Sequence, residues 1–164
     1  MSIRFNANEV FLMAERMEQN AAAFYRRAAE LNPSEHNQKF LHRLADMEDD
    51  HKKTFGAMRG RLGEAAKEAT AYDPMDEALL YLETMADTTK AEGAPEKRAQ
   101  LTGQESMEQI LRIAIGLEGQ AILFYMGIKD LVPEKLGKGK IDEIIREERS
   151  HVVILSKELK GLKK

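Results

Sequence analysis

The sequence of 164 residues contains no cysteine, and this absence excludes several kinds of chemistry together. Without thiols the chain cannot form disulfides, bind metals through thiolates or use a cysteine nucleophile. Proline is also scarce, with four residues at positions 33, 74, 95 and 133. Because proline breaks helix interiors, its scarcity in a chain rich in glutamate, alanine, leucine and lysine favours long helices.

Charge and hydropathy exclude further classes of protein. The formal net charge is −3, with no long basic block, so nucleic acid is not an expected partner. Residues 1–6 lack the apolar run of a signal peptide, and no apolar stretch approaches the roughly 20 residues that cross a bilayer. We therefore expect no membrane partner and a cytoplasmic protein, with residues 1–164 forming a single domain large enough to bury a core.

One arrangement of acidic residues and histidines occurs twice in the chain, one hundred residues apart. In each copy a glutamate precedes a Glu-x-x-His pair by thirty residues: Glu18 with Glu48 and His51, and Glu118 with Glu148 and His151. Superposing residues 18–51 on 118–151 without a gap gives eight identities. Unrelated sequence of ordinary composition would give roughly two, so the chain contains an internal repeat.

The spacing of apolar residues predicts four helices. In the first and third, apolar residues recur in alternating steps of four and three and form a stripe that contains the lone glutamate. The predicted helices run from a capping box at 6–9 to about 31, from about 35 to 60, from a capping box at 106–109 to before Pro133, and from about 141 to 159. In the second and fourth, the Glu-x-x-His pair lies on the apolar face.

Helix lengths place the polar residues of each hairpin at one level. From Glu18 to the break at residues 32–34, and from that break to Glu48, the helix legs are both roughly 20 Å long at about 1.5 Å per residue. We therefore predict an all-α, four-helix bundle of two antiparallel hairpins, 7–60 and 106–160. The crossover 61–105 is long enough to span the molecule and contains a short helix predicted at 74–87.

Six polar side chains would meet inside this bundle. Buried carboxylates repel one another and cost several kcal/mol each unless they are paired or protonated, whereas two divalent cations cancel four carboxylate charges. The pattern therefore predicts a two-metal site with these ligands: Glu18, Glu48, His51, Glu118, Glu148 and His151. Oxygen ligands with one imidazole per metal favour iron or manganese, and zinc can compete. The alternatives are a polar core without metal and a purely structural metal site.

Five other polar positions require interpretation. Tyr25 and Tyr125 lie two helical turns after their glutamates, where they either bond to ligand carboxylates or are ordinary core aromatics. Glu15 precedes Glu18 by one turn, but its counterpart is Ile115, so a partly exposed charge is favoured over an extra ligand. The remaining histidines, expected on the surface, are His36 and His42.

At these residues the chain resembles the rubrerythrin branch of the ferritin-like superfamily. Its di-iron bundles take one glutamate from each of two helices and a Glu-x-x-His pair from each of the other two. The resemblance covers about residues 7–60 and 105–160 and implies a ferritin-like bundle with two iron ions bound by the six residues above. It further implies that Glu48 and Glu148 are the bridging carboxylates.

The chain departs from rubrerythrins proper at three points. It lacks the cysteines of their rubredoxin-like iron centre, so electrons would come from a separate donor protein. Ala121 stands where those proteins tend to have a further glutamate. His151 stands where they more often have a glutamate, and the result resembles the symmetric ligand set of bacterioferritin.

The resemblance implies a non-haem di-iron oxidoreductase that reduces hydrogen peroxide or dioxygen. One alternative is a ferroxidase that handles iron, although mineral storage would require a large shell of many chains. Another is a metal-stabilised interaction or sensor domain without catalysis, in which residues 74–87 contact a partner. We expect a homodimer that uses peroxide or dioxygen together with a separate electron donor protein.

Overall fold

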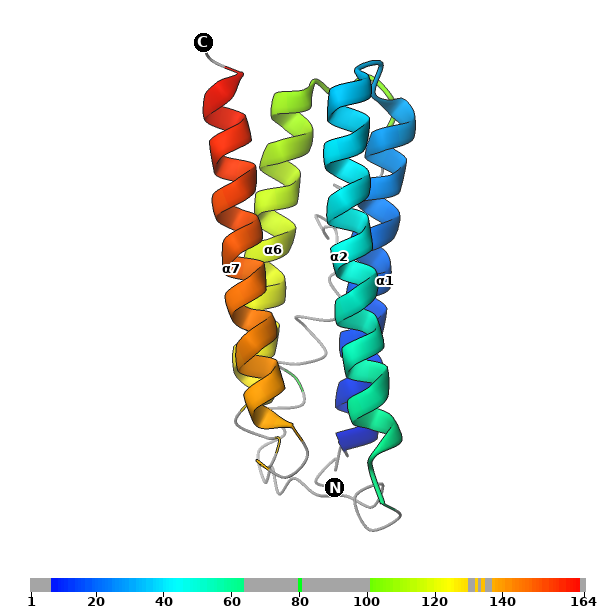
Figure 1. Cartoon of the computed structure of the whole chain (residues 1–164), viewed down its shortest axis with the longest axis vertical. Helices are drawn as coiled ribbons and strands as arrows, with labels where there is room; N and C mark the ends of the chain where they lie inside the picture. The colour runs from blue at the N-terminus through cyan, green and yellow to red at the C-terminus, as the bar shows by residue number, and fades with distance from the viewer. Residues whose placement is uncertain are drawn as a thin grey trace.

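Four long helices make up most of the part of the chain that the structure describes. The computed structural model describes residues 7–63, 80, 101–129, 132, 134 and 137–162. Within these residues the helices are α1 (Ala7–Leu31), α2 (Glu35–Gly60), α6 (Met107–Lys129) and α7 (Lys138–Gly161). Figure 1 shows them side by side with nearly parallel axes, which confirms the predicted all-α, four-helix bundle. The short helix predicted at 74–87 lies outside the described residues, apart from position 80.

The turn between α1 and α2 is held by side chains of the predicted break. Ser34 is the N-cap of α2, and its Oγ accepts a hydrogen bond of 3.4 Å from the N–H of Asn37. The buried Asn32 accepts hydrogen bonds of 3.1 Å through Oδ1 from the Ser34 N–H and from Asn37 Nδ2. These bonds satisfy polar groups in a tight connection, so the two helices return antiparallel to each other.

The second hairpin begins with the predicted capping box. The Gln109 N–H donates to Ser106 Oγ over 3.2 Å, and the Ser106 N–H donates to Gln109 Oε1 over 2.8 Å. The predicted start of the last helix at about residue 141 was wrong, because α7 begins at Lys138. Gly137, at φ 108°, makes the left-handed turn before the helix, and Gly139 lies within its first turn rather than delaying it.

The two hairpins are related as the internal repeat predicts. The helices pack extensively within each hairpin, α1 on α2 and α6 on α7, and the hairpins meet through α1–α6 and α2–α7 contacts. In Figure 1 the end of α2 and the start of α6 lie at opposite ends of the bundle. The chain therefore leaves the first hairpin at one end of the bundle and enters the second hairpin at the other.

Two apolar cores fill the bundle at different levels. One contains side chains from all four helices, including Phe11, Phe55, Phe124 and Ile141. The other core also contains side chains from all four helices, including Ala28, Leu41, Leu111 and Leu155. Fully burying a large apolar side chain stabilises a fold by roughly 1.5–3 kcal/mol. The two cores therefore hold the helices firmly on both sides of the level at which Glu18 lies.

One described helix, α6, is long and apolar enough to cross a membrane by length and composition alone. Its best window of 18 residues has a mean hydropathy of 1.3, and 33% of that window is buried. The expectation from the sequence was that no apolar stretch approaches such a length, and α6 differs from it because its apolar window includes the charged residues Arg112 and Glu118. A helix from the core of a globular bundle meets the same criterion, so the observation is weak support for a span.

Candidate metal centre

The six residues predicted as metal ligands lie together in a polar layer between the two apolar cores. Each helix contributes from its inner face: Glu18 from α1, Glu48 and His51 from α2, Glu118 from α6, and Glu148 and His151 from α7. None of the six is more than 3% exposed. The repeat thus predicted which side chains meet, while their role as metal ligands stays a prediction.

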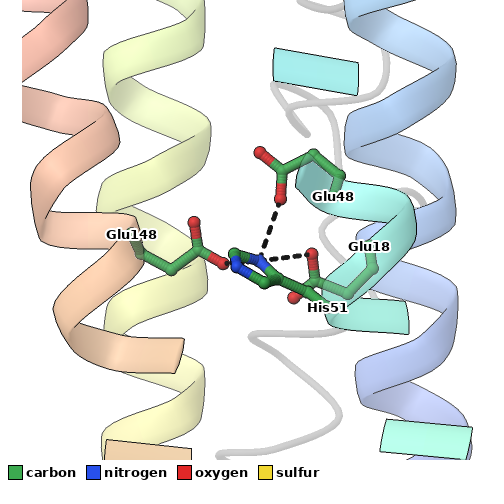
Figure 2. A group of neighbouring side chains, drawn as sticks. All are labelled: Glu18, Glu48, His51 and Glu148. Atoms are coloured by element: carbon green, nitrogen blue, oxygen red, sulfur yellow. Dashed lines mark ion pairs between the residues drawn. The ribbon is translucent and has the colours of Figure 1, made fainter. Parts of the chain in front are cut away.

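The first half of the layer surrounds the Nδ1 atom of His51 (Figure 2). This atom lies 3.5 Å from Glu18 Oε2, 3.4 Å from Glu48 Oε2 and 2.9 Å from Glu148 Oε1. One potential ligand atom from each of these four residues lies within 4.8 Å of the others, so they form a group able to hold a metal ion. Three come from the first hairpin and Glu148 comes from the second, so an ion here would connect the hairpins.

The second half of the layer repeats this geometry around His151. The Nδ1 atom of His151 lies 3.3 Å from Glu48 Oε1, 3.6 Å from Glu118 Oε1 and 2.9 Å from Glu148 Oε2. These four residues form a second group with potential ligand atoms within 4.8 Å of one another. The two imidazole rings are stacked, with centroids 5.5 Å apart and planes inclined by 16°.

Glu48 and Glu148 belong to both groups. Glu48 directs Oε2 toward His51 and Oε1 toward His151, whereas Glu148 directs Oε1 toward His51 and Oε2 toward His151. Each carboxylate therefore offers one oxygen to each group. Bridging carboxylates in a two-metal site require this arrangement.

Several buried polar atoms of the layer have no hydrogen-bond partner among the described residues. They are Glu48 Oε1, His51 Nδ1, both carboxylate oxygens of Glu148, and His151 Nδ1 and Nε2. A buried polar atom without a partner costs about 1–3 kcal/mol, and more when it is charged. All but His151 Nε2 belong to the inward contacts described above, where metal ions would coordinate them. The residues present therefore fit a metal pair bound by oxygen and imidazole nitrogen.

The pKa values of the buried glutamates Glu18, Glu48 and Glu118 are shifted in different directions. Desolvation by burial raises the pKa of Glu18 and of Glu118 well above the ordinary range of a glutamate. Burial also raises the pKa of Glu48, but the close approach of His151 and His51 outweighs it and lowers that pKa to about 2. The shared carboxylate Glu48 is thus held as an anion, as a bridging ligand has to be.

The two histidines respond to the surrounding carboxylates. Burial lowers the pKa of each imidazole, but contacts led by Glu148 for His51 and by Glu118 for His151 outweigh that effect. The pKa of His51 is raised far above its ordinary value, and that of His151 rises to about 12. Among the protein groups alone, protons on the imidazoles balance the carboxylates. Metal ions would replace those protons with a larger positive charge.

Two tyrosines connect the hairpins through the layer. The Tyr25 hydroxyl donates a hydrogen bond to Glu118 Oε1, and the Tyr125 hydroxyl donates one to Glu18 Oε1. Of the two interpretations of these tyrosines, the structure supports hydrogen bonding to the carboxylates. The sequence did not show that each tyrosine bonds to the glutamate of the other hairpin. Burial, followed by the neighbouring carboxylates, raises the pKa of both tyrosines well above normal, which keeps them as donors.

Other candidate residues lie outside the layer. Glu15 accepts hydrogen bonds of 2.5 Å from Arg59 Nε and 3.2 Å from Arg59 Nη2, so it forms a forked ion pair rather than an additional ligand. His36 is exposed, with Nε2 3.7 Å from a carboxylate oxygen of Glu158, and His42 is also exposed. Both histidines lie on the surface as predicted.

One contact was missed by reasoning from the sequence. Glu147 Oε2 lies 2.8 Å from His51 Nε2, on the side of the ring away from Nδ1. The helical pattern places position 147 outside the apolar stripe, and the equivalent position in the first repeat is Met47. The only signal was the position of this glutamate directly before Glu148, which is weak in an acidic helix.

Comparison with known proteins identifies the fold. No family model matches this chain, and no curated protein sequence matches it. Among solved structures, a crystal structure of a candidate ferritin-like diiron-carboxylate protein from Thermotoga maritima matches with a TM-score of 0.72 and 21% sequence identity. The match covers 98% of both chains. The chain therefore has a ferritin-like four-helix bundle.

Proposed function

We propose that this protein is a non-haem di-iron oxidoreductase that reduces hydrogen peroxide or dioxygen at a carboxylate-bridged site. The observation that carries the proposal is the sharing of Glu48 and Glu148 between the two groups, with one oxygen of each directed toward each histidine. A structural site for a single ion does not need two shared carboxylates. The description of the Thermotoga maritima protein as a diiron-carboxylate protein supports the di-iron part of this proposal.

The composition of the layer favours iron over softer metals. Four carboxylates and two imidazoles supply mainly oxygen ligands, which suit iron or manganese, whereas zinc competes for such sites. Two bound ferrous ions would supply the two electrons that convert hydrogen peroxide and two protons into two molecules of water. The chain contains no cysteine for a second iron centre of the rubredoxin type, so a separate donor protein would return the electrons.

The residues of this chain would prepare the site for that chemistry. Tyr125 holds one oxygen of Glu18, while the other oxygen of Glu18 faces His51. A ligand carboxylate restrained in this way is oriented before the ion arrives. The apolar cores on either side exclude bulk water, which strengthens the electrostatic interactions within the layer.

An anaerobic titration with ferrous ions tests the proposal directly. We expect the metal-free chain to bind two ferrous ions and then to consume one molecule of peroxide per pair, with the absorbance of a ferric product. Metal analysis of protein purified without added metal would show which ion the chain acquires. Metal binding without consumption of peroxide or dioxygen would contradict an oxidoreductase and support the structural or sensor alternative.

The fate of the iron distinguishes the proposed oxidoreductase from a ferroxidase. A ferroxidase that handles iron would oxidise ferrous ions repeatedly and release ferric product. Rapid reaction with peroxide, with the iron retained and reduced again by a donor, would support the proposed oxidoreductase. Sedimentation that shows a dimer rather than a large shell would also count against storage of mineral.

A further inference from the structure

The two histidines of the layer differ on the sides of their rings that face away from Nδ1. His51 Nε2 lies 2.8 Å from Glu147 Oε2, in a contact from α2 to α7. His151 Nε2 is fully buried and has no hydrogen-bond partner within the part of the chain that the structure describes. The inner contacts of the two rings are closely matched, so this outer contact breaks the symmetry of the layer.

The asymmetry originates in a single pair of repeat positions. Position 147 precedes Glu148 just as position 47 precedes Glu48, and the chain has glutamate at the first position and methionine at the second. A carboxylate is a strong hydrogen-bond acceptor, whereas the thioether of Met47 is a weak one. The residue that could hold His151 as Glu147 holds His51 is therefore missing at its repeat position.

The Glu147 contact determines which ring nitrogen of His51 is available to bind a metal. Because a carboxylate only accepts hydrogen bonds, the Nε2 atom of His51 must carry the hydrogen. The neutral ring then has its lone pair on Nδ1, the atom surrounded by the three carboxylates of Figure 2. A carboxylate behind a ligand histidine orients the ring and increases its donor strength. Among the described residues, no carboxylate supports His151 in this way.

We propose that Glu147 is a positioning residue that makes the two metal positions unequal, with the His51 position binding its ion more tightly than the His151 position. This inference rests on the proposed two-metal function and adds an order of loading. Loss of a partner behind a metal ligand typically weakens metal binding by about 10–100-fold. We therefore expect the two dissociation constants to differ by about that factor, with a stable form that holds one ion at His51.

The location of Glu147 allows a clean test. Its side chain is 55% exposed, so its replacement leaves no cavity in either apolar core. Glu143 lies one turn earlier on α7, is similarly exposed at 47%, and pairs with Lys140 at 2.6 Å. Replacing Glu143 removes the same charge from the same helix away from the layer. Glu143→Met is therefore the matched control for Glu147→Met.

The experiment is a calorimetric titration of the metal-free full chain with zinc ions alone. We expect wild type to bind two ions in two steps separated by about 10–100-fold in affinity. Glu147→Met should weaken the stronger step by a similar factor, so that the two steps merge. Glu147→Gln retains an acceptor oxygen and should restore part of the separation. Met47→Glu, which supplies the missing acceptor, should strengthen the weaker step.

Nitrogen-15 spectra of the histidines supply a readout that a merely structural role would not change. With one equivalent of zinc, wild type should show metal coordination at His51 Nδ1, a protonated His51 Nε2, and an uncoordinated His151. In Glu147→Met the same equivalent should divide between the two histidines. Glu143→Met should reproduce the wild-type titration and spectra.

Specific results would overturn the inference. Two steps of equal affinity in wild type would do so, as would an unchanged stronger step in a correctly folded Glu147→Met variant. If those results came from a chain that binds two ferrous ions and reduces peroxide, the inference alone would fail. If the chain bound no metal, the inference and the proposed function would fail together.

Discussion

The two hairpins contribute matching residues to the polar layer and differ in the residues around it. Both contribute a glutamate, a Glu-x-x-His pair and a tyrosine, and both place Phe and Tyr edge to face at neighbouring positions, with ring centroids 5.4 Å apart in one and 5.6 Å in the other. The forked Glu15–Arg59 pair of the first hairpin has no equivalent, because Ile115 replaces the glutamate. The comparison shows that the repeat preserves the six potential ligands and the two tyrosines, while the residues around them vary.

The largest expected effect is the loss of a shared carboxylate from either hairpin. Glu48→Ala and Glu148→Ala each remove a ligand from both groups and leave neighbouring buried charges without a partner. We expect both variants to lose two-ion binding and peroxide turnover to the same extent, measured by metal analysis and peroxide consumption. Glu143→Ala is the exposed control. Turnover at the wild-type rate in either variant would refute the ligand assignment.

Removal of metal tests whether the ions join the hairpins. Each group contains residues of both hairpins, so bound ions should resist their separation. An ion present at 100 times its dissociation constant stabilises the folded state by about 2.7 kcal/mol. We expect a chelator to lower the melting temperature and to speed amide exchange in all four helices at the level of the layer. Equal melting temperatures with and without metal would show that the ions do not hold the hairpins together.

Replacing each of the two tyrosines tests whether the hydrogen bonds between the hairpins contribute equally to stability. Tyr25→Phe and Tyr125→Phe each delete a hydrogen bond from one hairpin to a buried carboxylate of the other. The loss of a partner for a buried acceptor costs about 1–3 kcal/mol, so we expect similar destabilisation from the two variants in denaturant titrations of the metal-free chain. A large effect from one variant only would show that the hairpins are equivalent in sequence but not in energy.

The smallest expected effect concerns the loop that leads into the second hairpin. Hydrogen bonds led by the backbone N–H of Thr102 lower the pKa of Glu105 to about 2. A pKa lowered by folding stabilises the folded state above the ordinary pKa of the carboxyl and ceases to do so as the pH falls toward about 2. Glu105→Gln should therefore be slightly less stable than wild type at pH 6, and the difference should shrink on acidification. Unfolding titrations across that range measure it, and a difference that grows in acid would contradict this origin.

Much of the fold follows from the sequence because helix signals are local. The stripes of apolar residues, the break at 32–34 and the capping box at 106–109 each depend on residues within a few positions of one another. The start of α7 was predicted too late, because glycine is a poor helix former and its tolerance in a first turn depends on context. The short helix predicted at 74–87 stays a prediction.

The sequence also predicted which six polar side chains meet, because the repeat places them at equal distances from their turns. It did not predict which oxygen faces which histidine, that each tyrosine bonds across the hairpins, or that Glu147 lies behind His51. The tyrosine contacts and the Glu147 contact join residues more than ninety positions apart in the chain. No spacing within one helix encodes them.

The amino-acid sequence by itself determined the helices, their faces and the level of each buried carboxylate, because helix geometry is a short-range property of the chain. The resemblance had implied that Glu48 and Glu148 are shared between two groups. Tertiary structure alone decided which of their oxygens faces each histidine and that the histidines differ on their outer sides. The reason is that these features depend on the rotation and separation of packed helices. Those quantities are set by the two apolar cores acting together.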